Sequence, residues 1–193
     1  MKYIKITLSL LLFVLVFGCK KSNTIDKNQK LNVLFIIADD LNCDLGSYGH
    51  PQVISPNIDR LAKNGTLFGN VHNQYPLCGP SRASFMTGMY TDQTKMTNNN
   101  VLLRTTVTDV ITMGQRFRQQ GYRSVRIGKI YHFDNPSSIG TYSADDIYTW
   151  DQTINPYGRD KIEEYKINTL IPRQYGGTLS WLAADGTDKE QTD

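Results

Sequence analysis

The sequence has few of the residues that build metal–thiolate sites. It contains three histidines and three cysteines in 193 residues, and no Cys-x-x-Cys pair. A structural zinc site needs more cysteine and histidine ligands at short spacing, so the sequence does not predict one. No internal repeat is apparent, and this gives no support to a repeat architecture.

Charge of one sign is also scarce. The net charge of +3 comes from 21 basic and 18 acidic side chains that are scattered along the chain. This excess is too small to indicate a nucleic-acid partner, and we expect none. With 39% hydrophobic and 20% charged residues, the chain is long enough for one globular domain with a substantial core.

The longest apolar stretch at the N-terminus, residues 6–17, is too short to cross a membrane comfortably. It follows Lys2 and Lys5 and ends at Gly18-Cys19, a pattern that resembles a bacterial lipobox. We therefore expect residues 1–18 to be a signal peptide, Cys19 to carry lipid and residues 19–30 to be a tether. The protein would then be exported and anchored to a cell-envelope membrane, on its periplasmic or surface side. The alternatives are an ordinary signal peptide or an N-terminal anchor.

From Leu31 onward the sequence has the pattern of an α/β fold. Residues 31–38 form a nearly continuous apolar run, typical of a strand buried on both faces of a parallel sheet that helices cover. Asp39 and Asp40 follow this run directly. Because ligand-binding residues gather at the carboxyl ends of such strands, we expect both carboxylates at a functional edge.

Further elements are expected along the chain. Ser55 and Gly65 predict a short amphipathic helix between them, and residues 66–72 are expected to form another strand. A helix over residues 108–120 and a strand over residues 122–127 follow.

This order of elements favours right-handed βαβ units. Lys129 and His132 lie just past the strand over residues 122–127. The topology would then bring them to the same sheet edge as Asp39 and Asp40.

The stretch "PLCGPSRASFMTG" surrounds Cys78 with residues that a structural cysteine does not need. The thiol could be a nucleophile with His72 or His132 as its base, or a redox cysteine, but neither explains Pro80 and Arg82. The stretch resembles the signature of type I sulfatases: Cys-x-Pro-x-Arg, two variable residues, two apolar residues and Thr-Gly. The matching residues are Cys78, Pro80, Arg82, Phe85, Met86, Thr87 and Gly88.

The resemblance implies that a formylglycine-generating enzyme or a radical maturase oxidises Cys78 to formylglycine, whose hydrated aldehyde attacks sulfur. Pro80 suits the first turn of a helix, so residue 78 would lie at a helix N-terminus, which favours anions. Arg82, one turn later, would hydrogen-bond the formylglycine hydroxyl.

A disulfide between Cys43 and Cys78 is the simpler expectation for an exported protein. Formylglycine formation would exclude it and leave Cys43 a free, small filler.

Two further motifs are similar to those of the family. Asp39 and Asp40 resemble its metal pair and, with residue 78, would hold Ca²⁺ or Mg²⁺. "GKIYH" resembles its Gly-Lys-x-x-His element, which implies that Lys129 and His132 bind sulfate and that His132 aids proton transfer.

The resemblance is greatest to the iduronate-2-sulfatase subgroup and is clear from residue 31 to residue 132. It implies an alkaline-phosphatase-like α/β fold and a sulfated sugar as substrate, such as a uronic-acid 2-O-sulfate in a polysaccharide. Asp44, His50 and His72 match no motif, although Asp44 and His50 would lie near the metal.

The family's later metal ligands, on an Asp-His-Gly or Asp-Asn-Gly element, have no counterpart in this sequence. We therefore expect residues 31–193 to be the N-terminal part of a sulfatase catalytic domain, as a fragment, a truncated gene or half of a split protein. One alternative is a truncated, inactive lipoprotein that only binds sulfated glycans. Another is a phosphatase of the same superfamily, although a Ser or Thr would then replace Cys78.

Overall fold

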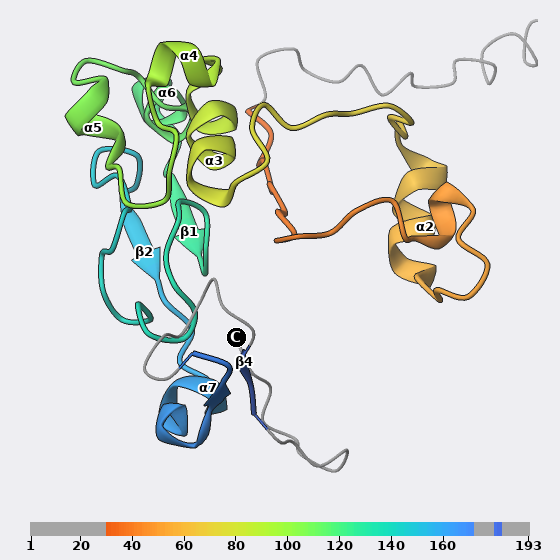
Figure 1. Ribbon diagram of the computed structural model, residues 1–193. Coiled ribbons are helices and arrows are strands. Elements are labelled where there is room, and N and C mark those ends of the chain that lie inside the picture. The colour runs from red at the N-terminus through yellow and green to blue at the C-terminus, as the bar shows by residue number, and fades with distance from the viewer. Residues whose placement is uncertain (1–29, 172–179, 183–193) are drawn as a thin grey trace, which may run out of the picture. The chain divides into compact units, whose positions relative to one another are not determined.

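The computed structural model describes residues 30–171 and 180–182 (Figure 1). The chain divides into two units, Met1–Asp39 and Asp40–Asp193, and every described helix and strand belongs to the second. In chain order these elements are η1 (Gly46–Tyr48), α2 (Pro56–Asn64), α3 (Cys78–Thr87), α4 (Thr91–Thr94), α5 (Leu103–Thr106), α6 (Met113–Gln119), β1 (Val125–Ile127), β2 (Gln152–Ile154), α7 (Arg159–Ile162), η2 (Glu164–Lys166), β3 (Asn168–Thr169) and β4 (Ser180–Trp181).

Two of the expected strands do not form. Residues 31–38 have no strand, and Leu34 and Ile36 are 84% and 75% exposed. Residues 66–72 are also irregular, with Phe68 67% exposed. A strand requires a hydrogen-bonded neighbour, and the two sheets in the described residues contain only β1 with β2 and β3 with β4. Neither run therefore joins a sheet among the described residues.

Helix α2 confirms the prediction from its end signals. Ser55 occupies the N-cap position, Pro56 begins the helix and Gly65 follows its last residue. The Ser55 hydroxyl donates to Asp59 Oδ1 at 2.9 Å and accepts from the backbone nitrogen of Gly46 at 2.9 Å. These bonds connect α2 to η1.

The buried core lies around α3. It consists of Ala83, Met86, Met96, Leu103, Val110 and Tyr131. Helix α3 contacts α4 and α6, which are beside it in Figure 1. Since Tyr131 belongs to the expected Gly-Lys-x-x-His element, this core joins that element to the cysteine-bearing helix.

Helix α6 is shorter than predicted. Thr112 caps it, because its hydroxyl accepts from the backbone nitrogen of Gln115 at 3.3 Å. The residues before Thr112 stay outside the helix, and the carbonyl groups of Thr108 and Val110 accept from Arg104 Nη1 instead.

The strand expected over residues 122–127 is reduced to β1. It pairs in parallel with β2, in the register Val125–Gln152 and Ile127–Ile154. The sequence analysis missed β2, and residues 128–151 between the two strands contain no helix. The parallel pair is therefore not the βαβ unit that was expected.

Gly114 in α6 permits close contact with the segment before β2. A Cβ atom on Gly114 would lie 2.6 Å from Thr149 Cγ2 and 2.8 Å from the Thr149 carbonyl oxygen. Replacing Gly114 by alanine is therefore expected to destabilise the chain by about 1 to 3 kcal/mol through overpacking. Urea denaturation measures this change. Gly69→Ala is the matched control, since a Cβ there meets no atom within 4 Å. Equal stability of the two variants would contradict the prediction.

Candidate functional site

Cys78 is the first residue of α3, as the motif predicts. Leu77 is the N-cap, and its carbonyl oxygen accepts from the Ser81 nitrogen at 3.0 Å. The helix ends at Thr87, and the next residue, Gly88, caps it with a left-handed φ of 71°. The Cys78 thiol is free and partly exposed. It therefore lies at the positive end of a helix dipole, where an anion is favoured.

Arg82 joins this helix to the segment after β1. The residue is only 5% exposed. Its Nη1 donates to the carbonyl oxygens of Lys129 at 3.1 Å and Ile130 at 2.8 Å. The structure thus brings the Cys-x-Pro-x-Arg helix against the Gly-Lys-x-x-His segment. The expected bond from Arg82 to the modified side chain of residue 78 stays a prediction.

Lys129 and His132 follow β1 directly, as expected. Gly128 turns the chain between them and the strand with a φ of 68°, and its nitrogen donates to the Ile154 carbonyl at 2.9 Å. Lys129 and His132 are both partly buried, and His132 Nε2 lies 3.5 Å from Asp134 Oδ1. With Arg82, this segment contributes cationic or protonatable groups that suit an anionic ligand.

Arg126 holds the same segment from the strand side. It is 4% exposed and forms an ion pair with Asp145. Its Nη1 donates to the Gly128 carbonyl at 3.0 Å and to Asn155 Oδ1 at 2.7 Å. The carbonyl groups of residues 128, 129 and 130 therefore all accept from buried guanidinium groups.

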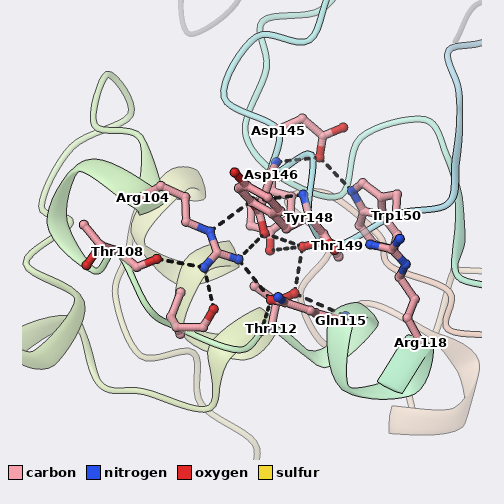
Figure 2. A network of polar contacts seen from close by, with 12 residues as sticks. Arg104, Thr108, Thr112, Gln115, Arg118, Asp145, Asp146, Tyr148, Thr149 and Trp150 are labelled. Atoms are coloured by element: carbon pink, nitrogen blue, oxygen red, sulfur yellow. Dashed lines mark hydrogen bonds and ion pairs between the residues drawn. The ribbon is translucent and has the colours of Figure 1, made fainter. Parts of the chain in front are cut away.

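A second ion pair joins the partly buried Arg104 to Asp146, the residue that follows Asp145 (Figure 2). Arg104 donates to both carboxylate oxygens of Asp146, from Nε at 3.1 Å and from Nη2 at 2.9 Å. Burial alone would raise the pKa of Asp146, but hydrogen bonds from Arg104 and Thr149 and the charge of Arg104 outweigh it. The pKa of Asp146 consequently lies below its usual value. The hydrogen bond to Asp146 also raises the pKa of Arg104.

Threonine hydroxyls connect this pair to Tyr131. Thr149 Oγ1 donates to Asp146 Oδ2 at 2.7 Å and lies 2.7 Å from Thr112 Oγ1. The Tyr131 hydroxyl lies 3.0 Å from the same Thr149 oxygen. Burial raises the pKa of the Tyr131 phenol, so the hydroxyl keeps its proton at neutral pH.

The metal site expected at Asp39, Asp40 and residue 78 stays a prediction. Asp39 and Asp40 are both exposed. Asp39 is the last residue of the first unit, and Asp40 is the first residue of the second. No group of three His, Cys, Asp or Glu side chains in this part of the chain could hold an ion. Carboxylate oxygens have the chemistry that Ca²⁺ and Mg²⁺ prefer, but Ca²⁺ takes six to eight ligands. The two aspartates would supply only part of such a site.

The remaining predicted residues lie in exposed loops or outside the described residues. Cys43 is a free thiol, as expected, but it is exposed and is not a packed filler. Asp44 Oδ1 and His50 Nε2 are 3.9 Å apart, and His72 Nε2 lies 2.8 Å from Asn70 Oδ1. These contacts place neither histidine beside Cys78.

The signal peptide, Cys19 and the tether precede the described residues. Among the residues that are described, no helix has the length and apolar character needed to span a membrane.

Sequence reasoning missed the buried and partly buried residues that support this site. Arg126, Asp145 and Asp146 belong to no motif, and their partners are distant in the sequence. Asn99 Oδ1 accepts from the Gly79 nitrogen at 2.8 Å, next to Cys78. A Cβ atom on Gly79 would lie 3.0 Å from that oxygen, which favours glycine at this variable motif position.

Comparisons with known proteins identify relatives across most of the chain. The family model "Sulfatase" matches residues 31–192. Human iduronate 2-sulfatase is 39% identical over 149 residues, which are 77% of this chain and 26% of that protein. A sulfatase of Formosa agariphila is 36% identical over 140 residues, 67% of this chain and 28% of its own length. The chain thus spans about a quarter of the length of the curated relatives it matches.

A solved structure supports the predicted fold class. The phosphonate monoester hydrolase of Agrobacterium radiobacter aligns with a TM-score of 0.51 and 22% identity, over 66% of this chain and 26% of its own. At this identity the likeness shows the fold alone, which is the alkaline-phosphatase-like α/β fold. The family model covers most of the chain, and helix α3, which carries the Cys-x-Pro-x-Arg motif, lies against the Gly-Lys-x-x-His segment. This chain therefore belongs to the sulfatase family.

Proposed function

We propose that the protein hydrolyses the sulfate ester of a sulfated sugar, with residue 78 as its nucleophile after conversion to formylglycine. The observation that carries this proposal is the pair of hydrogen bonds from Arg82 to the Lys129 and Ile130 carbonyls. These bonds fix the helix that begins at Cys78 to the segment that carries Lys129 and His132. A nucleophile and two sulfate-binding groups are thereby held in one unit of the chain.

Each residue has a definite role in this proposal. The N-terminus of α3 and the Lys129 ammonium group attract the sulfate oxygens, because both carry positive charge. His132 binds sulfate and aids proton transfer as sulfate is released. Arg82 orients the Lys129 segment and would also hydrogen-bond residue 78. The hydrated aldehyde of formylglycine would supply the attacking oxygen.

A divalent cation is part of the proposal. Asp39 and Asp40 would contribute carboxylate oxygens to Ca²⁺, or to Mg²⁺, together with residue 78. When bound, the ion would polarise the sulfate and make the attacking hydroxyl more acidic. Further oxygen ligands would have to come from outside the described residues.

The substrate class and the location are proposed from the relatives and from the N-terminal sequence. The name iduronate 2-sulfatase among the relatives favours a uronic-acid 2-O-sulfate or similar group, which we propose to lie in a polysaccharide. The lipobox-like Gly18-Cys19 sequence supports an exported protein with a lipid anchor in a cell-envelope membrane. A formylglycine-generating enzyme or a radical maturase would be its modifying partner.

Mass spectrometry of the cysteine peptides tests the proposal. When the protein is produced together with a formylglycine-generating enzyme, the Cys78 peptide is expected to show the mass of the aldehyde. The Cys43 peptide of the same digest is the internal control and is expected to keep its thiol, because no Pro or Arg follows at the motif spacing. The modified protein should hydrolyse a chromogenic sulfate ester, and Cys78→Ala should abolish this activity. A Cys78 that remains a thiol, or sulfated-glycan binding without turnover, would contradict the proposal.

A further inference from the structure

Four successive residues of the sulfate-binding segment are held by buried polar groups. The carbonyl oxygen of Gly128 accepts from Arg126, and those of Lys129 and Ile130 accept from Arg82. The fourth contact is made by a side chain, because the Tyr131 hydroxyl reaches Thr149 Oγ1 at 3.0 Å. The next residue is His132. A shift of this segment would therefore break several of these hydrogen bonds.

The contact of Tyr131 differs from the other three because it belongs to a longer hydrogen-bonded chain. From Tyr131 it runs through Thr149 to Asp146 and from there to Arg104. Tyr131 is 4% exposed, and Thr149 is fully buried. Figure 2 shows Asp146 between Arg104 and Thr149, with Thr112 on the far side of the Thr149 hydroxyl. Because each donor and acceptor in this network has a partner, the tyrosine hydroxyl has one well-defined position.

The two ion pairs behind the segment use adjacent aspartates. Asp145 accepts from Arg126 and from Trp150 Nε1, the latter at 2.8 Å, while the neighbouring Asp146 accepts from Arg104 and Thr149. The Trp150 ring also packs edge-on against the Tyr131 ring, with centroids 6.3 Å apart. The residues from Asp145 to Trp150 thus contact Tyr131 through both its ring and its hydroxyl.

We propose that Tyr131 is a positioning residue. Through Thr149 and the Asp146–Arg104 pair, its hydroxyl fixes the segment that presents Lys129 and His132 to the ligand. This inference rests on the proposed function for the role of those two residues as sulfate-binding groups. Tyr131 itself does not touch the ligand in this arrangement, because its hydroxyl is directed into the buried network.

The imidazole resonances of the full chain test this positioning role. The chain has three histidines, so His132 is the reporter and His50 and His72 are internal references. Tyr131→Phe removes the hydroxyl and keeps the ring against Trp150. We expect it to move the His132 ¹H–¹³C resonance and to leave the other two unchanged. Tyr142→Phe is the matched control, since Tyr142 is 70% exposed, and we expect it to move none of the three.

Two substitutions of Thr149 separate the hydroxyl from its packing. Thr149→Val keeps the methyl group and loses the hydroxyl, whereas Thr149→Ser does the reverse. We expect Thr149→Val to shift His132 as Tyr131→Phe does, and Thr149→Ser to restore the parent position. A purely steric role of Thr149 would give the opposite order. If Thr149→Val does not fold, the Tyr131→Phe result alone decides.

Titration with inorganic sulfate connects this effect to the ligand. We expect Tyr131→Phe to weaken sulfate binding about fivefold, the effect of one neutral hydrogen bond. An unmoved His132 resonance in Tyr131→Phe, or equal movement of all three histidines, would overturn the positioning role. If the parent chain does not bind sulfate while His132 responds as expected, the positioning geometry stands and the proposed sulfate site fails.

Discussion

Replacing Asp146 by alanine is expected to destabilise the chain by about 1.5 to 3 kcal/mol, because the partly buried Arg104 guanidinium loses its charged hydrogen-bond partner. Asp146 is 4% exposed, and it accepts two hydrogen bonds from Arg104 and one from Thr149. Its removal would leave the Arg104 guanidinium facing a cavity and would release the Thr149 hydroxyl. Urea denaturation monitored by circular dichroism measures the loss.

The matched control for this substitution is Asp109→Ala. Asp109 is exposed, and changes at such surface positions usually stay within about 0.5 kcal/mol. A loss at Asp146 no greater than that at Asp109 would show that the ion pair contributes nothing to stability.

The same carboxylate gives a prediction for pH. The pKa of Asp146 is lower in the folded chain than in the unfolded chain, so its ionised form stabilises the fold above the unfolded pKa of about 3.9. This contribution is lost as the pH falls through the folded pKa. The stability difference between the parent and Asp146→Asn should therefore be constant near neutral pH and should narrow below about pH 4. A difference that stays unchanged down to pH 3 would contradict this assignment.

Arg82→Met is expected to destabilise the chain by about 3 kcal/mol, since the Lys129 and Ile130 carbonyls lose a buried donor. Methionine fills part of the space of the arginine stem but donates no hydrogen bond. The change should also be local, because both acceptors lie in the segment after β1. Hydrogen exchange should increase in a peptide that covers residues 128–132 and remain unchanged in one that covers α2.

Arg60→Met is the matched control for Arg82→Met. Arg60 is exposed on α2, and its replacement is expected to leave both stability and exchange near the parent values. If Arg82→Met does not increase exchange in residues 128–132, the two bonds do not hold this segment.

The elements that the sequence predicts well are those with local signals. Helix α2 begins after Ser55 and ends before Gly65, and α3 has Pro80 in its first turn and ends before Gly88. The position of Lys129 and His132 directly after β1 also follows from a local pattern. These features depend on residues a few positions apart, so a single sequence contains the information.

The features that the sequence did not predict depend on distant partners. The apolar run over residues 31–38 has the composition of a buried strand, but no described strand pairs with it. The strand β2 is only three residues long and forms by pairing with β1. Arg126 and Asp145 are 19 residues apart and belong to no motif. Secondary-structure propensity alone cannot identify such ion pairs. The local signal for this one was the pair of adjacent aspartates, Asp145 and Asp146, shortly before Trp150.

If the proposed sulfate site is correct, the segment from Gly128 to Tyr131 has a consequence for the thermodynamics of anion binding. Its carbonyl groups accept from Arg82 and Arg126, and the Tyr131 hydroxyl reaches Thr149. An incoming oxyanion therefore does not have to order this loop, and the entropic penalty of association falls mainly on the Lys129 side chain. Calorimetry of sulfate binding should consequently show only a small unfavourable entropy of binding, as expected for a preorganised site.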